Sequence, residues 1–185
     1  MDALEALIGR TSCPRLEGPA PTAEQVDLML RAALRAPDHG ALRPWRFILT
    51  EGEGLERLGE LFLRAARETE PELTPAMEKK YRQMPLRAPM IITVVAVLQE
   101  HPKVPEEEQL ISAGCAAHAI TQAAHALDLG AIWRTGAMTH NPRVRSELGL
   151  TEQEQIVGFI YLGQRCRERK TPVLDPQTFL TRWEG

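Results

Sequence analysis

The chain has 185 residues, of which 43% are hydrophobic, so it is long and apolar enough to fold around a core as one domain. Its 22 basic and 25 acidic side chains give a formal charge of −3, which gives no support to a nucleic-acid partner. The longest apolar run, Met90–Leu98, is far shorter than the ~20 residues of a membrane helix. We predict a single domain over residues 1–185, with an extension at residues 164–185 and no membrane partner.

The cysteines and the N-terminal segment favour a reducing compartment. Cys13, Cys115 and Cys166 are odd in number, widely spaced and without any CxxC pair, so they indicate neither a disulfide framework nor a cysteine zinc site. The N-terminal segment lacks the basic and long apolar regions of a secretory signal. We therefore expect a cytoplasmic protein.

The first part of the chain alternates between helical and extended patterns. Apolar residues within 4–8 have the spacing of a short helix. Thr22 and Gln25 form the pattern of a capping box that opens a second helix, which Pro37 stops. Residues 45–50 are β-branched and aromatic enough for a strand, and Trp45 is expected to anchor it in the core.

The middle of the chain carries the longest helices and the most apolar strand. The spacing over residues 55–66 predicts a long helix, and Thr74-Pro75 has the pattern that opens another. Met90–Leu98 is uninterrupted and apolar, which is typical of a strand buried on both faces. A helix rich in small residues is predicted from about residue 106 to 129, with Gly130 at the glycine position that ends a helix.

The last part of the chain ends in an apolar tail. We predict strands at residues 131–135 and 156–163, with a helix between Asn141 and Gly149. The tail carries Phe179, Leu180 and Trp183 without a core of its own, so we expect it to dock elsewhere. The alternation of strands and helices ordinarily indicates a parallel α/β sheet, although an antiparallel sheet flanked by helices would give much the same pattern.

The sequence lacks the common nucleotide and hydrolase motifs. It contains no GxGxxG after a strand, no GxxxxGK[ST], no GxSxG and no HExxH. Cys115, His118, Gln122 and His125 fall roughly on one face of the long helix and could share a transition metal. A structural zinc site normally has four ligands. We therefore favour a helix face whose histidines are hydrogen-bonded, and we predict no metal.

Three irregular segments are rich in hydrogen-bond donors, and each lies at the end of a predicted element. They are Arg10-Thr11-Ser12, the loop from Arg35 to Trp45, and Trp133-Arg134-Thr135. Guanidinium groups bind phosphate bidentately, and hydroxyl groups add short neutral hydrogen bonds. Each segment alone could be an exposed turn or a strand exit.

These segments carry a family resemblance that covers nearly the whole chain. MDALEALIGRTS, RAPDHGALRPWRFILTEGEG, RAPMIITVVA, SAGCAAHAI, AIWRTGAMT and IVGFIYLG resemble the flavin-dependent nitroreductase family, in particular its small branch. The loop departs from the wider family pattern, because Ala41 and Arg43 stand where that pattern has Asn and Gln.

The resemblance implies an α+β fold around a mostly antiparallel sheet flanked by helices. It implies a homodimer with FMN at the subunit interface, the small-residue helix in the dimer core and the tail extending onto the partner subunit. The residues it implies for FMN binding are Arg10, Thr11, Ser12, Arg35, His39, Trp133, Arg134 and Thr135. The residues it implies for contact with NAD(P) are Ala123, Ala124, His125, Ala126, Leu127 and Asp128.

The implied activity is a ping-pong reduction of nitroaromatic or other oxidised small molecules with NAD(P)H as hydride donor. The flavin carries out the redox chemistry, and a fixed cation such as Arg134 or Arg35 would favour its reduction. No catalytic acid or base is required, so none is named. Two alternatives remain: a flavin-dependent dehydrogenase or reductase of an unidentified metabolite, and a flavin-binding protein without turnover.

Overall fold

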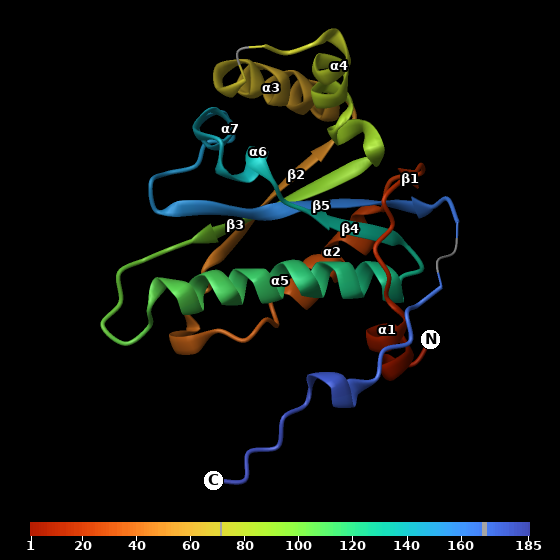
Figure 1. Cartoon of the computed structure of the whole chain (residues 1–185), viewed down its shortest axis with the longest axis vertical. Helices are drawn as coiled ribbons and strands as arrows, with labels where there is room; N and C mark the ends of the chain where they lie inside the picture. The colour runs from red at the N-terminus through yellow and green to blue at the C-terminus, as the bar shows by residue number, and fades with distance from the viewer. Residues whose placement is uncertain (71, 168–169) are drawn as a thin grey trace.

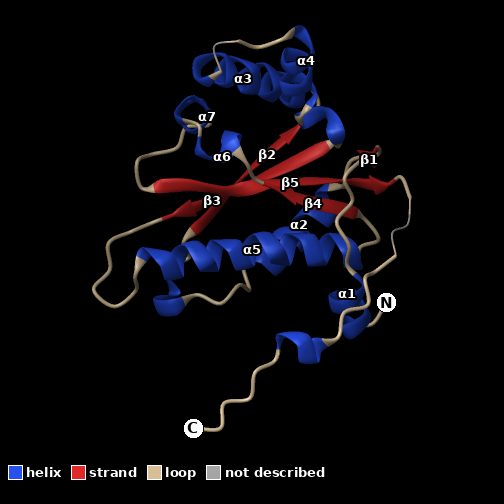
Figure 2. Cartoon of the chain, in the orientation of Figure 1, coloured by secondary structure: helices blue, strands red, loops and turns tan. Residues whose placement is uncertain are grey.

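One antiparallel sheet organises the chain in a computed structural model, which describes residues 1–70, 72–167 and 170–185 (Figures 1 and 2). Central β5 pairs with β1, β3 and β4, and β3 also pairs with β2, so β2 is an edge strand. The strands are β1 (Leu16–Glu17), β2 (Trp45–Glu51), β3 (Met90–Val97), β4 (Gly130–Arg134) and β5 (Glu154–Arg165). The antiparallel sheet that the family resemblance implies is confirmed.

The parallel α/β interpretation is wrong because helical connections do not fix strand direction. The helices are α1 (Ala3–Gly9), α2 (Ala23–Ala33), α3 (Glu53–Thr69), α4 (Pro75–Gln83), α5 (Glu106–Ala126), α6 (Ala137–His140) and α7 (Pro142–Glu147). Three short 3₁₀ turns are η1 (His39–Ala41), η2 (Pro85–Arg87) and η3 (Pro176–Phe179). Helices α3 and α4 pack together and return the chain to the end of β2, where Met90 pairs with Glu51.

The sheet separates two apolar layers, so β3 is buried on both faces as predicted. Ile92 points into a core with Met29 of α2 and Ile120 of α5. The neighbouring Ile91 points the other way, into a core with Phe62 of α3. Figure 1 shows α2 and α5 on one side of the sheet and α3, α4, α6 and α7 on the other.

Local sequence signals explain most helix starts. Thr22 and Gln25 form the predicted capping box at α2, and Thr74 accepts a hydrogen bond from the backbone amide of Met77 at the start of α4. Helix α2 ends at Ala33, before the Pro37 stop that the sequence predicts. The short elements β1 and α6 were not predicted, because two to four residues carry too little periodicity to detect.

The prediction that Gly130 ends the long helix is wrong. Asp128 adopts the left-handed conformation there, with φ of 62°, and Gly130 is already the first residue of β4. A Cβ atom at Gly130 would lie 2.3 Å from the Cδ2 of Leu16. Glycine at this position therefore lets the segment that contains β1 pack closely against β4.

The two ends of the chain leave much apolar surface exposed. The outward faces of α1 and of the tail include Leu4, Leu7, Phe179 and Trp183, and the Trp183 side chain is 90% exposed. Figure 1 shows the C-terminal segment extending away from the body of the chain. Within the described residues, no helix combines the length and the apolar character that crossing a bilayer requires.

Candidate functional site

Two of the three donor-rich segments lie side by side. The backbone amide of Cys13 donates to the carbonyl of Ala131 at 2.9 Å, and Arg134 Nη2 donates to the carbonyl of Pro14 at 2.9 Å. The strand β4 therefore runs beside the segment that follows α1. These contacts bring residues 13 and 14 next to Ala131 and Arg134, although the sequence separates them widely.

Two groups of residues form the candidate site. The first is a cationic cluster at the C-terminal end of α5, formed by Arg10, His125 and Arg165. Arg165 Nη1 lies 3.3 Å from His125 Nδ1, and its Nη2 donates to the carboxylate of Asp128. Burial lowers the pKa of His125, and the charges of Arg165 and Arg10 lower it further. At neutral pH the cluster therefore has two guanidinium groups around a neutral imidazole, close to the hydroxyl groups of residues 11 and 12.

Sequence reasoning missed Arg165. It lies at the end of β5, and it reaches the cluster because β5 pairs with β1 there, with Arg165 opposite Leu16. Only the strand pairing brings Arg165 to this position, and no local sequence pattern predicts that pairing.

The second group surrounds a cavity of about 260 Å³ beside β4, here called the β4 cavity. Its lining residues are Phe62, Met84, Arg87, Ile132, Trp133, Arg134, Thr135, Met138, Phe159 and Tyr161. The guanidinium carbon of Arg134 lies 5.5 Å from the centre of the Tyr161 ring. Burial lowers the pKa of Arg134, and the charge of Arg87 lowers it further.

Two features of the β4 cavity indicate an anion. The Nε atom of Arg134 is buried and has no hydrogen-bond partner within the described residues. Burial raises the pKa of Tyr161 to about 12, so its phenol stays neutral at physiological pH and supplies no negative charge. The cavity therefore contains cationic groups that no carboxylate among the described residues neutralises.

The Trp133 side chain faces the other side of the sheet from Arg134, as the period of two along a strand requires. Its Nε1 donates to the carbonyl of Val157 at 3.2 Å. Val157 is the extra residue of a β-bulge, because Val94 pairs with Gly158 while Val95 pairs with Ile156. The indole lies over Gly158, where a Cβ atom would be 2.0 Å from Nε1.

The third donor-rich segment, the loop between α2 and β2, has a fixed shape. Ala41 and Arg43 have positive φ angles of 54° and 50°. The Asp38 carboxylate holds this shape by accepting hydrogen bonds from the backbone amides of Leu42 at 3.1 Å and Arg43 at 2.7 Å. The two residues that depart from the family pattern therefore lie at strained backbone positions.

Side chains of this loop face α5 or solvent, and one is buried. His39 Nδ1 lies 2.7 Å from the Glu108 carboxylate in the first turn of α5, while Arg35 is exposed. Trp45 is buried in the core with Ala96 and Ala113, so its predicted role as a core anchor is confirmed.

The loop is far from the cationic cluster. Glu108 and His125 lie near opposite ends of α5, about 25 Å apart along its axis at the ~1.5 Å rise per residue of an α-helix. Within one chain, His39 therefore lies at the opposite end of α5 from the cationic cluster.

The segment implied for NAD(P) contact has mixed surroundings. Ala124 is fully buried in the core under α5, whereas His125 and Asp128 contact Arg165. Ala126 and Asp128 are exposed, and Ala123 and Leu127 are partly buried.

The alternative metal site is not assembled. His118 contacts Gln122 at 3.2 Å, and His125 contacts Arg165. Within residues 1–70, 72–167 and 170–185, no three Cys, His, Asp or Glu side chains are grouped as metal ligands.

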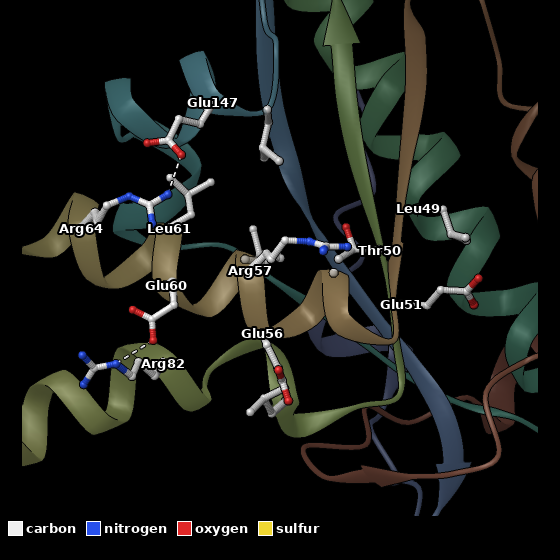
Figure 3. A pocket seen from close by; sticks show the side chains of 14 residues that line it. Leu49, Thr50, Glu51, Glu56, Arg57, Glu60, Leu61, Arg64, Arg82 and Glu147 are labelled. Atoms are coloured by element: carbon white, nitrogen blue, oxygen red, sulfur yellow. Dashed lines mark hydrogen bonds and ion pairs between the residues drawn. The ribbon is translucent and has the colours of Figure 1, made fainter.

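A larger cavity, of about 1060 Å³, lies between the end of β2 and α3 (Figure 3). Its charged groups are largely neutralised, because Arg64 pairs with Glu147 at 2.6 Å and Arg82 pairs with Glu60 at 2.8 Å. None of the residues predicted to bind FMN lines it. We therefore place the candidate site at the cationic cluster and the β4 cavity, despite their smaller volume.

Comparison with known proteins identifies the family of the chain. Residues 7–164 match the family model described as "Nitroreductase family". The chain belongs to the nitroreductase family. It is 49% identical over 183 residues to "Putative NAD(P)H nitroreductase YdjA" of Escherichia coli strain K12, covering 98% of this chain and 99% of that protein.

Solved structures of nitroreductases share the fold. The crystal structure titled "Nitroreductase-like Family Protein", from Bacillus cereus, has a TM-score of 0.86 at 23% identity and covers 100% of this chain and 97% of that chain. A "putative nitroreductase in complex with FMN" from Desulfovibrio desulfuricans has a TM-score of 0.77 at 21% identity. The match covers 100% of this chain and 99% of that chain.

Proposed function

We propose that this nitroreductase is an FMN-dependent oxidoreductase that uses NAD(P)H to reduce nitroaromatic or other oxidised small molecules. The observation that carries the proposal is the cationic cluster beside the β4 cavity, which together suit one phosphate and one electron-accepting ring. The Escherichia coli relative is named for NAD(P)H, and the Desulfovibrio desulfuricans structure contains FMN.

The cationic cluster has the chemistry of a phosphate site. Arg10 and Arg165 supply guanidinium groups, and Thr11 supplies a hydroxyl group. A phosphate dianion would relieve the mutual repulsion of the two arginines. The cluster would hold one phosphate, and the chain lacks a dinucleotide fingerprint, which favours FMN over FAD.

The β4 cavity suits one edge of the flavin ring. Its volume of about 260 Å³ is below the ~300 Å³ at which small-molecule pockets begin. One chain would therefore cover only part of the cofactor. When bound, FMN supplies the hydride chemistry, while Arg134 and the cavity walls orient the ring and set its electrostatic surroundings.

A second copy of the chain would complete the site. His39 contacts Glu108, about 25 Å along α5 from the cationic cluster at ~1.5 Å per helical residue, so it does not reach a phosphate bound there in the same chain. We propose a homodimer in which this loop reaches the FMN of the partner subunit.

The exposed surface supports the homodimer. The chain exposes 11523 Å², against about 8,900 Å² expected for a monomer of its 20.7 kDa mass. Part of the excess is the apolar tail, which includes Phe179 and Trp183. We propose that residues 164–185 extend from the single domain onto the partner subunit and are buried there.

A ping-pong reaction order follows from the proposed site. Donor and acceptor would use the same open side of the ring in turn, so the product of the first must leave before the second binds.

Within residues 123–128, buried Ala124 cannot supply a side-chain contact to NAD(P)H, so we propose that the exposed members do. The three free cysteines fit a cytoplasmic location.

The direct test is an FMN titration of the apo-protein followed by steady-state assays. We expect a yellow protein that binds FMN and oxidises NAD(P)H when an acceptor is added, with parallel lines in double-reciprocal plots. Arg165→Ala should weaken FMN binding by about 1.5–3 kcal/mol, as expected for a hydrogen bond to a charged group. The control is Arg57→Ala, which removes the same charge on α3.

Each possible result separates the proposal from its alternatives. A protein that binds no FMN contradicts the proposal. FMN binding without turnover by any acceptor favours a flavin-binding protein, and turnover restricted to acceptors without a nitro group favours a reductase of another metabolite.

A further inference from the structure

We infer that Arg87 is a further residue of the flavin site and that, together with Arg134, it forms a paired cationic wall for the negative charge of reduced FMN. The inference rests on the proposed function. The family resemblance includes Arg87 in the segment RAPMIITVVA but implies no role for this residue, which lies in the short η2 turn before β3.

The position of Arg87 is well fixed. The turn contains Pro85, whose ring is buried, and it is followed by Ala88 and Met90, which are 4% and 2% exposed. The Arg87 side chain lines the β4 cavity with Arg134 and Thr135. A rigid backbone on both sides means that the side chain needs little further ordering to meet a ligand.

The second observation is that these two arginines lack carboxylate partners. No ion pair in the described parts of the chain joins Arg87 or Arg134 to Asp or Glu. On the same side of the sheet, Arg64, Arg67, Arg82 and Arg143 are each paired with a glutamate, whereas Arg145 donates to backbone carbonyls of residues 151 and 154. Arg87 and Arg134 are therefore like charges that line one cavity without a carboxylate partner.

Like charges held near each other disfavour their own ionised forms. The charge of Arg87 acts on both Arg134 and Tyr161 across the cavity, so all three groups share one electrostatic environment. An anion in the cavity would relieve the repulsion and would also offer a partner to the orphaned Nε of Arg134.

Reduced FMN has the right charge for this wall. Hydride transfer from NAD(P)H adds two electrons and one proton to a neutral ring and releases NAD(P)⁺, so the ring gains one negative charge near N1 and the C2 carbonyl. Fixed cations aimed at a developing charge stabilise the charged form more than the neutral form. Arg87 should therefore strengthen the binding of reduced FMN more than that of oxidised FMN.

The experiment compares Arg87→Gln and Arg87→Lys with wild type. The dissociation constant is measured for oxidised FMN and for dithionite-reduced FMN under anaerobic conditions, and the midpoint potential of bound flavin is measured independently. The matched control is Lys80→Gln. Lys80 is exposed and lines a second groove that also includes Arg87, but it does not line the β4 cavity.

We expect Arg87→Gln to weaken the binding of reduced FMN at least tenfold more than that of oxidised FMN. This selective loss corresponds to a fall of about 30 mV in the two-electron midpoint potential. Arg87→Lys should restore part of the potential, and Lys80→Gln should leave it unchanged. If Arg87→Gln does not fold, Arg87→Met provides the same comparison with an uncharged side chain of similar length.

If Arg87→Gln weakens the binding of oxidised and reduced FMN equally, or weakens neither, the inference is overturned while the proposed function stays intact. A wild-type protein that binds neither form of FMN would contradict the proposed function itself, and the inference with it. A potential shift in Lys80→Gln as large as that in Arg87→Gln would show a general effect of surface charge and would also overturn the inference.

Discussion

Replacing Gly158 with alanine tests how the fold positions the β4 side of the site. A Cβ atom there would lie 2.0 Å from Trp133 Nε1, 2.5 Å from Trp133 Cδ1 and 3.0 Å from the carbonyl oxygen of Arg134. The indole would have to move, and its hydrogen bond to the bulged residue Val157 would be lost. The neighbouring backbone of β4 restricts any compensating shift of the strand.

The cost of this substitution has two parts. The lost hydrogen bond contributes about 0.5–1.5 kcal/mol. Inserting a methyl group into a packed contact adds about 1–3 kcal/mol. We therefore expect Gly158→Ala to lower the free energy of unfolding by roughly 1.5–4.5 kcal/mol and to weaken FMN binding, because residues 133–135 line the β4 cavity.

Urea unfolding followed by circular dichroism, together with an FMN titration, measures both effects. The control is Gly18→Ala, because a Cβ atom there would have no neighbour within 4 Å. The control should change stability by less than about 0.5 kcal/mol. If Gly158→Ala matches the control in stability and FMN affinity, the close packing of Trp133 over β5 is wrong.

Three further predictions concern stability. Arg46→Met should lower the free energy of unfolding in urea by about 2–3 kcal/mol, because it leaves the buried Glu154 carboxylate without its partner. This loss is smaller than that for a fully buried ion pair, because the Arg46 side chain is partly exposed. The hydrogen bond from Arg46 lowers the pKa of the Glu154 carboxylate. The stability of the wild-type protein should therefore fall as pH drops below about 4.5, and the stability of Arg46→Met should fall less. The lowered pKa of His125 means that the apo-protein loses stability as pH falls below about 6.5, and His125→Asn should remove that loss in thermal melts. Trp45→Ala should cost about 3–5 kcal/mol, and a loss below about 1 kcal/mol would contradict its buried position.

Much of the fold could be predicted from local signals. The capping boxes and the period of the apolar residues located the main helices, and the uninterrupted run Met90–Leu98 located the strand buried on both faces. Strand direction could not be predicted, because the α3–α4 pair reverses the chain in a way that no local pattern encodes.

The candidate site was predicted only in part. Residues 10–12 and 133–135 stood out by their donor content, and the structure joins the segment that follows residue 12 to β4. Arg165, Arg87 and Glu108 could not be found, because each is an ordinary charged residue at the end of an element and only the strand pairing and helix packing bring it to its partners. The sequence also could not reveal that His39 lies far from the cationic cluster.

The central claim is that two copies of the chain share each FMN site. It can be tested by purifying a heterodimer, with a different tag on each subunit, from Arg165→Ala and the double variant Arg35→Ala/His39→Ala. If each site combines the cationic cluster of one subunit with the loop of the other, the heterodimer has one intact site and one with both defects. We predict that it binds one FMN per dimer with wild-type affinity, although neither variant homodimer does. A heterodimer that recovers no wild-type site would contradict the account, because a site built within one chain would be damaged in both subunits.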